Sequence, residues 1–219
     1  MLKNTILTKM ILALLGIISL SFSIVLLIKT GLGLNALNAL YANLSIATGL
    51  SIGFFSWFIG FIFISINKVI SKKKFNWGAL VVAFLIGYCI DFFMKSLENS
   101  FHYDYLMTNI VIFIVMTIVS GIAISLLIFS GMPSPLEEYQ FAICKLFKTT
   151  IGTSKLYTDL SLVIFAVLVG LIWGNGLGQI NIGTIIISLV TGKIVDMSLK
   201  SLKNIEKKLE MSKIKLNKV

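Results

Sequence analysis

The stretch GALVVAFLIGYCIDFFMKSL, residues 78–97, is answered by GTIIISLVTGKIVDMSLKSL, residues 183–202, at an offset of 105 positions (183 minus 78). The identical positions are Gly78, Gly87, Asp91, Lys95, Ser96 and Leu97 in the first stretch and Gly183, Gly192, Asp196, Lys200, Ser201 and Leu202 in the second. Apolar spans resemble one another by composition alone, but a repeat carried by Gly, Asp, Lys and Ser is harder to obtain that way. The sequence therefore predicts a duplicated chain.

The composition is that of a membrane protein. Of 219 residues, 57% are hydrophobic and 13% are charged, and the apolar residues are massed in long runs. Each run approaches the ~20 residues that cross the hydrocarbon core as a helix. The runs lie near residues 10–28, 50–70, 78–94, 107–129, 156–173 and 182–199. We therefore predict an all-α fold, a polytopic membrane helical bundle with six transmembrane helices.

Two shorter helices are expected between these spans. Residues 34–48 and 135–149 follow glycine-led turns and are too short to span, so each copy holds three spans and one short helix. An odd number of spans makes the second copy enter the membrane from the opposite side. The prediction is an inverted 3+3 repeat, with residues 1–105 as the first repeat, 106–202 as the second and 203–219 as a basic cytoplasmic tail that forms an interfacial helix.

The lysines predict the orientation of the chain. All nineteen basic residues are lysines, and with the amino terminus inside only Lys29 and Lys95 lie at the outer boundary, which leaves seventeen (nineteen minus two) on the cytoplasmic side. Short cytoplasmic loops collect positive charge in this way. The equivalent connectors differ in the same sense, because residues 71–74 include three lysines whereas residues 174–181 carry no charge. We expect a multi-pass protein of the cytoplasmic membrane with both termini in the cytoplasm.

The remaining composition limits the function classes. The net charge of +10 comes from lysines beside spans, where anionic lipids attract each of them by ~1 kcal/mol. The expected partner is thus a bilayer with anionic lipids, and nucleic-acid binding is not expected. Two cysteines, one histidine and no arginine support neither a disulfide framework, a metal site nor a glutamate-pair intramembrane protease. We expect no cofactor, no metal and no enzymatic activity.

The starts of the short helices carry local signals. Ser134-Pro-Leu-Glu137 reads as a capping box with proline at the first helical position, whereas Asn35-Ala-Leu-Asn38 offers an asparagine cap alone. Three turn glycines are expected to break helices and to leave amide groups that could receive an anion, namely Gly31, Gly33 and Gly131. Four others are expected to permit close helix contact, namely Gly78, Gly87, Gly183 and Gly192.

Gly31-Leu-Gly33 with Asn38-Ala-Leu40, followed by Thr48-Gly-Leu-Ser-Ile-Gly53, resembles the first repeat of the bacterial YczE/YyaS/YitT membrane-protein family, and the YczE branch above all. The segment from Gly131 to Glu138 and the pair Gly183-Thr184 resemble its second repeat. The resemblance covers roughly residues 10–202 and implies a multi-pass protein of the cytoplasmic membrane, in a family whose members are largely without an assigned biochemical activity. Ala36 and Asn38 stand where the family often carries proline and aspartate.

Acidic residues inside spans are the candidates for chemistry. A carboxylate in lipid costs at least ~2.5 to 3.5 kcal/mol, so such residues usually face the bundle, a cavity or a partner. Asp91 and Asp196 either pair with Lys95 and Lys200, four residues on, or act as symmetric gates or ion ligands. Lys193 could compete for Asp196 on the same helix face.

Asp159 has no acidic counterpart in the first copy, because aligning Gly152 with Gly49 places Ser56 opposite it. Lys155 precedes it by four residues, so a structural pair and a proton or cation site both remain open. Of the two adjacent glutamates, Glu137 is assigned to the helix cap and Glu138 is the freer carboxylate.

The leading hypothesis is a small secondary transporter or exporter of an unknown small solute. Its inverted halves would rock around a site lined by the short helices and by Asp159, Glu138 and Asn38. Two alternatives stay open: a substrate-binding membrane subunit of an ATP-driven uptake system, and a non-transporting membrane scaffold. A membrane protein partner or a homo-oligomer is compatible with each of them.

Overall fold

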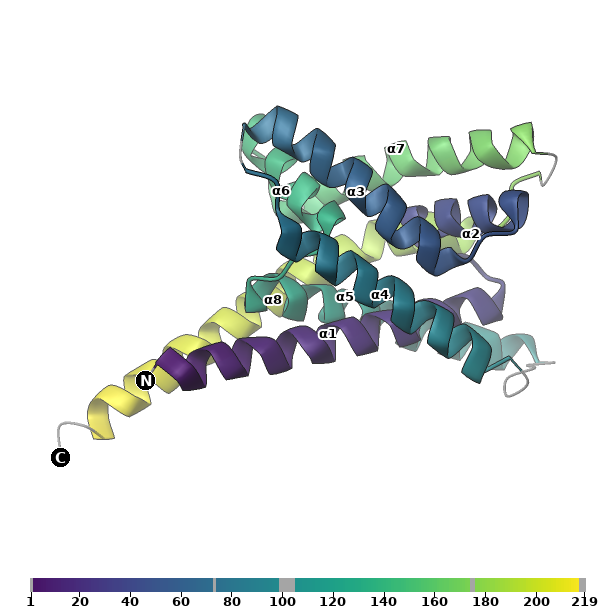
Figure 1. The fold of residues 1–219 in the computed structure, drawn as a ribbon. Helices are drawn as coiled ribbons and strands as arrows, with labels where there is room; N and C mark the ends of the chain where they lie inside the picture. Colours follow the sequence, from purple (N-terminus) through teal and green to yellow (C-terminus); the bar gives the residue numbers. More distant parts are fainter. Residues whose placement is uncertain (1, 73, 99–104, 174–175, 217–219) are drawn as a thin grey trace.

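The computed structural model describes residues 2–72, 74–98, 105–173 and 176–216, with side chains for residues 6–208 within those ranges. This part of the chain forms eight helices and no strand. The helices are α1 Leu2–Thr30, α2 Ala36–Thr48, α3 Ile52–Ser71, α4 Trp77–Ser96, α5 Leu106–Ser130, α6 Pro135–Phe147, α7 Ile151–Ile172 and α8 Ile182–Leu216 (Figure 1). Lys73 and residues 174–175 of the two connectors lie outside the described residues.

Six of the helices are long and apolar enough to cross a membrane, which confirms the predicted all-α bundle of six spans. They are α1, α3, α4, α5, α7 and α8. The two short helices, α2 and α6, come second in each half of the chain and end within two residues of the predicted limits. Their neighbours begin at polar caps, since Ser51 and Thr150 accept hydrogen bonds from the first turns of α3 and α7.

The helix packing repeats itself between the halves. Helices α1 and α5 pack against each other, and each covers the last helix of its own half, so α1 contacts α4 and α5 contacts α8. Each short helix packs against a helix of the other half, since α2 packs on α7 and α6 packs on α3. Every one of these pairs has its counterpart when α1–α4 are exchanged with α5–α8. This is the pattern expected of a duplicated unit.

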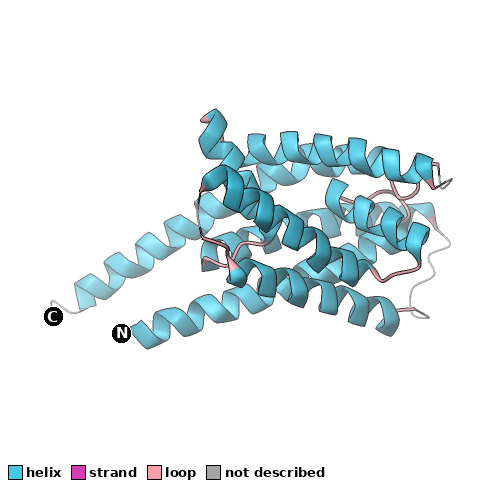
Figure 2. Ribbon diagram, turned by 45° about the horizontal axis from the view of Figure 1, so that its top comes forward, coloured by secondary structure: helices cyan, strands magenta, loops and turns pink. Residues whose placement is uncertain are grey.

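The two equivalent connectors, α3–α4 and α7–α8, can be located from the helices that they join. The start of α1 and the end of α8 lie at one end (Figures 1 and 2). Helix α3 ends and α4 begins at that same end, whereas α7 ends and α8 begins at the opposite end (Figure 1). The two equivalent connectors therefore lie at opposite ends of the molecule.

The repeated glycines and aspartates hold equivalent helix pairs together. Asp91 Oδ1 accepts a hydrogen bond from the Gly53 backbone N–H over 2.9 Å, at the first turn of α3, and Asp196 is hydrogen-bonded by the Gly152 backbone at the first turn of α7. A negative side chain at a helix start satisfies amide groups that have no partner inside the helix. The expected pairing of these acids with Lys95 and Lys200 is not seen, because within the described residues the only ion pair lies elsewhere.

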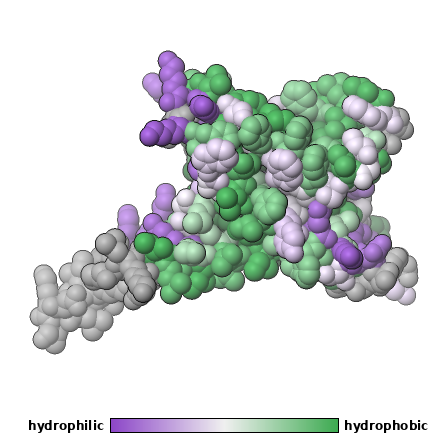
Figure 3. All heavy atoms as spheres, viewed as in Figure 1, coloured by the Kyte–Doolittle hydropathy of each residue, from purple (hydrophilic) through white to green (hydrophobic). Residues whose placement is uncertain are grey.

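The outer surface of the bundle is apolar. Trp77, Val81 and Tyr88 of α4 and Ile182 of α8 are among the large side chains exposed there, and Figure 3 shows hydrophobic residues covering most of this face. Such a surface suits lipid rather than water. Residues 203–216 of the basic tail continue α8 without a break, because the chain has no glycine or proline between residues 193 and 216 to end the helix.

Candidate functional site: a buried charged cavity between the short helices

A small cavity of about 50 Å³ lies inside the bundle, where the starts of α2 and α6 meet the middle of the spans. Its volume suffices for a few water molecules. Its polar lining consists of Asn35, Asn38, Tyr41, Ser56, Ser134, Glu137 and Lys155. The apolar lining comes from α1 to α6, with Leu20, Ile24, Leu37, Gly60, Phe63, Ala83, Ile86, Ile124, Pro135 and Leu136.

The cavity is lined by residues that occupy equivalent places in the two halves. Helix α6 begins 99 residues after α2 (135 minus 36), and α7 begins 99 residues after α3 (151 minus 52). This offset makes Glu137 the counterpart of Asn38 and Lys155 the counterpart of Ser56, and all four line the cavity. The cavity therefore lies where the two halves meet.

The same offset corrects the alignment made from sequence. Gly152 corresponds to Gly53, because each provides the backbone contact to the repeated aspartate, and Gly49 is instead the turn after α2. Asp159 is thus the counterpart of Gly60 rather than of Ser56. The Gly49 alignment used an offset of 103 residues (152 minus 49), whereas the observed offset is 99 for α6 and α7 and 105 for α8 (182 minus 77). Helix α7 is two residues longer than α3 (22 against 20) and the connector after it is four residues longer (nine against five), which together give the six-residue difference.

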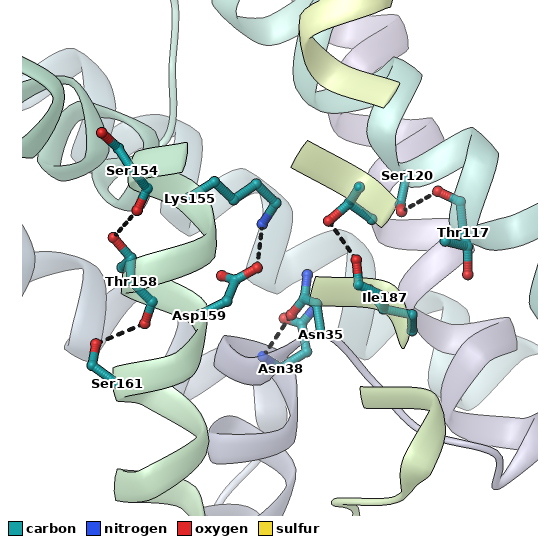
Figure 4. Close-up of polar contacts among 11 residues, drawn as sticks. Asn35, Asn38, Thr117, Ser120, Ser154, Lys155, Thr158, Asp159, Ser161 and Ile187 are labelled. Carbon is teal, nitrogen blue, oxygen red and sulfur yellow. Dashed lines mark hydrogen bonds and ion pairs between the residues drawn. The ribbon is translucent and has the colours of Figure 1, made fainter. Parts of the chain in front are cut away.

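Three ionisable side chains from the second half are buried beside this cavity. Glu137 is 5% exposed, Lys155 3% and Asp159 1%. Lys155 Nζ donates to Asp159 Oδ2 over 2.9 Å along one face of α7, and this is the only ion pair in the described chain. Figure 4 shows Lys155 extending toward the Asp159 carboxylate, with Asn35 and Asn38 on the facing side. The structural pair that the sequence left open is present.

Glu137 is fixed by the predicted capping box. Its Oε2 accepts a hydrogen bond from the Ser134 backbone N–H over 2.8 Å, and the Ser134 side chain caps the turn in return. Burial raises the pKa of the Glu137 carboxyl, against the opposing effects of the Ser134 hydrogen bonds and the nearby Lys155 charge. Burial, together with Glu137, also raises the pKa of Tyr41 on the facing short helix. These groups form one electrostatic cluster.

Asn38 and Tyr41 complete the cavity on the α2 side. The Asn38 backbone N–H donates to Asn35 Oδ1 over 2.9 Å, which caps α2. Within the described residues, the Asn38 side-chain amide and the Tyr41 hydroxyl have no protein partner. Both are therefore available to whatever occupies the cavity.

Glu138 does not share this site. Its carboxylate accepts a hydrogen bond from Asn76, the cap of α4, and it lines a separate groove of about 530 Å³. That groove lies over the α3–α4 connector and is also lined by Asn67, Ser71, Lys74 and Lys145. The cavity carboxylate is Glu137 instead. The sequence correctly assigned Glu137 to the helix cap and Glu138 to no cap. It is the capping residue Glu137, however, that lines the cavity.

The other candidate residues lie away from the cavity. Asp91 and Asp196 bind the starts of α3 and α7, as described above. Lys193 is exposed on α8 and forms no ion pair with Asp196. The structure thus brings Asn38 and Asp159 into one region of the bundle and leaves Asp91, Asp196, Lys193 and Glu138 outside it.

The glycines divide into turn residues and contact residues. Gly31, Gly33 and Gly131 have positive φ angles of 65°, 138° and 81° at the turns before the short helices, a conformation that favours glycine. A Cβ on Gly33 would lie 2.5 Å from the Thr184 backbone nitrogen, and one on Gly87 would lie 2.6 Å from the Gly53 carbonyl oxygen. A Cβ on Gly183 would lie 2.3 Å from the Leu32 carbonyl oxygen, and one on Gly192 would lie 3.0 Å from the Gly152 carbonyl oxygen, a looser contact. Gly78 differs, since only its own helix cap is near it.

Asn43 was not singled out from the sequence. It is fully buried, and its amide donates to the carbonyls of Ala166 and Leu177 and accepts from the Gln179 backbone N–H. It thereby ties α2 to α7 and to the following connector. An asparagine in an otherwise apolar helix face was the available signal.

The comparisons with known proteins place this geometry in a family. Residues 7–200 match the model of a family described as a family of unknown function (DUF6198). The chain is 26% identical over 181 residues to the "Uncharacterized protein YyaS" of Bacillus subtilis (strain 168), covering 82% of this chain and 87% of that protein. It is 28% identical over 187 residues to the "Uncharacterized membrane protein YczE" of the same organism, covering 84% and 82%. No solved structure matches. The resemblance drawn from the glycine motifs is confirmed for YyaS and YczE.

Proposed function

The chain belongs to the family of unknown function DUF6198, which supplies no activity, so we propose its function from its own geometry: a secondary transporter that moves a small solute through the central cavity. The observation that carries the proposal is the burial of Glu137, Lys155 and Asp159 where the two halves meet. Ionisable residues inside a membrane bundle are costly and mark pathways for solutes or protons.

The arrangement of the halves supports a mechanism. Short helices that start inside the bundle, at the junction of two repeats, are the usual way in which transporters build a site. The connectors at opposite ends of the bundle favour an inverted pair, and such a pair exposes one site to either side by rocking its halves. The rigid units would be α3–α4 and α7–α8, each held by its aspartate-to-glycine contact.

The proposed setting is the cytoplasmic membrane, with both termini and the Lys74 connector in the cytoplasm. Lysines near that boundary would bind anionic lipid head groups. The cavity of about 50 Å³ is too small for an organic solute, so this conformation represents a closed state. Transport rather than catalysis is the proposed activity.

The experiment measures access to the cavity and needs no knowledge of the solute. Cys89 and Cys144 are replaced by serine, and Ser56→Cys is introduced as the cavity probe. An impermeant maleimide is applied to right-side-out and to inside-out vesicles. A transporter exposes the cavity in turn to both sides, so Ser56→Cys should react in both vesicle types.

A matched control is Ile90→Cys, a fully buried core position away from the cavity, which should react in neither preparation. Reaction of Ser56→Cys from one side only would favour a one-sided receptor, such as the substrate-binding subunit of an ATP-driven uptake system. No reaction from either side would favour a scaffold. Either result would contradict the proposal.

A further inference from the structure

The charges beside the cavity do not balance. Two carboxyls, Glu137 and Asp159, face one amine, Lys155, so the fully ionised set carries one net negative charge in an apolar interior. Lys155 is committed to Asp159 by a 2.9 Å ion pair. Glu137 is the carboxyl left without a cation of its own. An uncompensated buried charge costs several kcal/mol, an effect large enough to change the protonation of the group.

No other side chain that lines the cavity supplies the missing positive charge. Helix α2 contributes Tyr41 as its only titratable group, α6 contributes Glu137, and α7 contributes Lys155 with Asp159 behind it. The lining residues from α1, α3, α4 and α5 are neutral: Leu20, Ile24, Ser56, Gly60, Phe63, Ala83, Ile86 and Ile124. The simplest particle that neutralises the site is a proton on Glu137.

The surroundings of Glu137 can hold both forms of the carboxyl. One oxygen accepts the Ser134 N–H, a bond that a carboxylate and the carbonyl oxygen of a carboxylic acid can each make. A hydroxyl on the other oxygen could donate, directly or through cavity water, to the free side-chain oxygen of Asn38. An alkali cation is less suited, because Lys155 lines the same small space and would repel it.

Resting on the proposed transport function, we infer that Glu137 is a proton-carrying residue, protonated while the cavity is closed and ionised when the cavity opens to water. On opening, the carboxyl O–H bond breaks, the proton passes to water and a hydrated carboxylate remains. On closure the carboxylate takes a proton from the water on that side. Each passage through the closed state thus carries one proton from the side that closes to the side that opens. The return passage carries one proton back unless a cationic solute neutralises Glu137 in its place, and in that case the solute is exchanged for a proton.

The test uses the full-length protein in lipid nanodiscs and infrared difference spectroscopy, titrated from about pH 5 to about pH 9, a range in which buried carboxyls are known to titrate. A protonated buried carboxyl gives a carbonyl stretch that an ionised one lacks. We expect this band in the wild type, its decrease as the pH rises, and its loss in E137Q. Glutamine keeps the capping acceptor, so E137Q should fold. E138Q, altered at the adjacent residue in the separate groove, is the matched control and should keep the band.

Absence of the band in the wild type, or its persistence in E137Q, would overturn the inference. A second variant guards against an E137Q that does not fold. N38D places a second carboxyl at the counterpart position in the same cavity, and a like charge there favours the protonated form of Glu137, so the band should persist to a higher pH than in the wild type. An N38D spectrum like that of the wild type would count against it. The labelling of Ser56→Cys tests the transport function separately from the proton. If Ser56→Cys is labelled from both sides but no Glu137 band is seen, the inference that Glu137 carries a proton is refuted and the proposed transport function is not.

Discussion

The Lys155–Asp159 pair allows the sharpest stability prediction. Each side chain is almost completely removed from solvent, and each is the other's only ion-pair partner in the described chain. Lys155→Met leaves the Asp159 carboxylate buried beside a second acid, and Asp159→Asn leaves the Lys155 ammonium without its partner. Breaking a buried pair in this way costs about 3–5 kcal/mol. We expect each single variant to lower the free energy of unfolding by that amount.

The double variant separates pairing from mere packing. When both charges are removed, neither is left uncompensated, and replacing a whole buried pair is often close to neutral. We therefore expect Lys155→Met with Asp159→Asn to lose much less than the sum of the two single losses. The assay is reversible unfolding in mixed micelles with increasing SDS, followed by circular dichroism. Additive losses, or single losses below about 1 kcal/mol, as for an exposed pair, would refute the reasoning.

Three further predictions use the same unfolding assay. A methyl on either Gly53 or Gly152 meets an aspartate side chain, but the neighbouring backbone carbonyl oxygen would lie 2.4 Å from the new Cβ at Gly53 and 3.1 Å from it at Gly152. Gly53→Ala should therefore cost about 1–3 kcal/mol and Gly152→Ala less, and equal costs would contradict this. Asn43→Ala should cost about 1–3 kcal/mol by leaving buried backbone partners unsatisfied, and an unchanged midpoint would argue against that network. The raised pKa of Glu137 in the fold gives stability that is present at acid pH and is lost as the pH rises through that pKa. The free energy of unfolding should therefore fall as the pH rises above the ordinary carboxyl range, and it should fall less in E137Q than in the wild type and E138Q. A parallel fall in E137Q would contradict the assignment.

The helices themselves could be predicted from sequence because their signals are local. Apolar runs near 20 residues give the spans, and the Ser134 capping box gives the start of α6 to the residue. Glycines before the short helices give the turns, since Gly31 and Gly131 need positive φ angles. None of these inferences requires knowledge of which helices pack against each other.

The cavity could not be predicted because it depends on the register between the halves. The pairing of Gly152 with Gly49 implies an offset of 103 residues (152 minus 49), but α7 follows α3 at an offset of 99, so Ser56 was set opposite Asp159 rather than Lys155. The choice between Glu137 and Glu138 likewise depends on which side of α6 faces α7, and the capping role of Glu137 concealed its second position in the cavity. The contact between Asp91 of α4 and the start of the neighbouring helix α3 could not be predicted either, because the sequence indicated only a lysine four residues away as its partner.

The account depends on the second half being the first half turned over in the membrane, and equivalent connectors report on this most directly. Single cysteines at Lys72 and at Leu177, in the background without Cys89 and Cys144, mark the α3–α4 and α7–α8 connectors. Intact cells are labelled with an impermeant maleimide before and after permeabilisation. We predict that Leu177→Cys reacts in intact cells and that Lys72→Cys reacts only after permeabilisation. Labelling of both positions from the same side of the membrane would contradict the account.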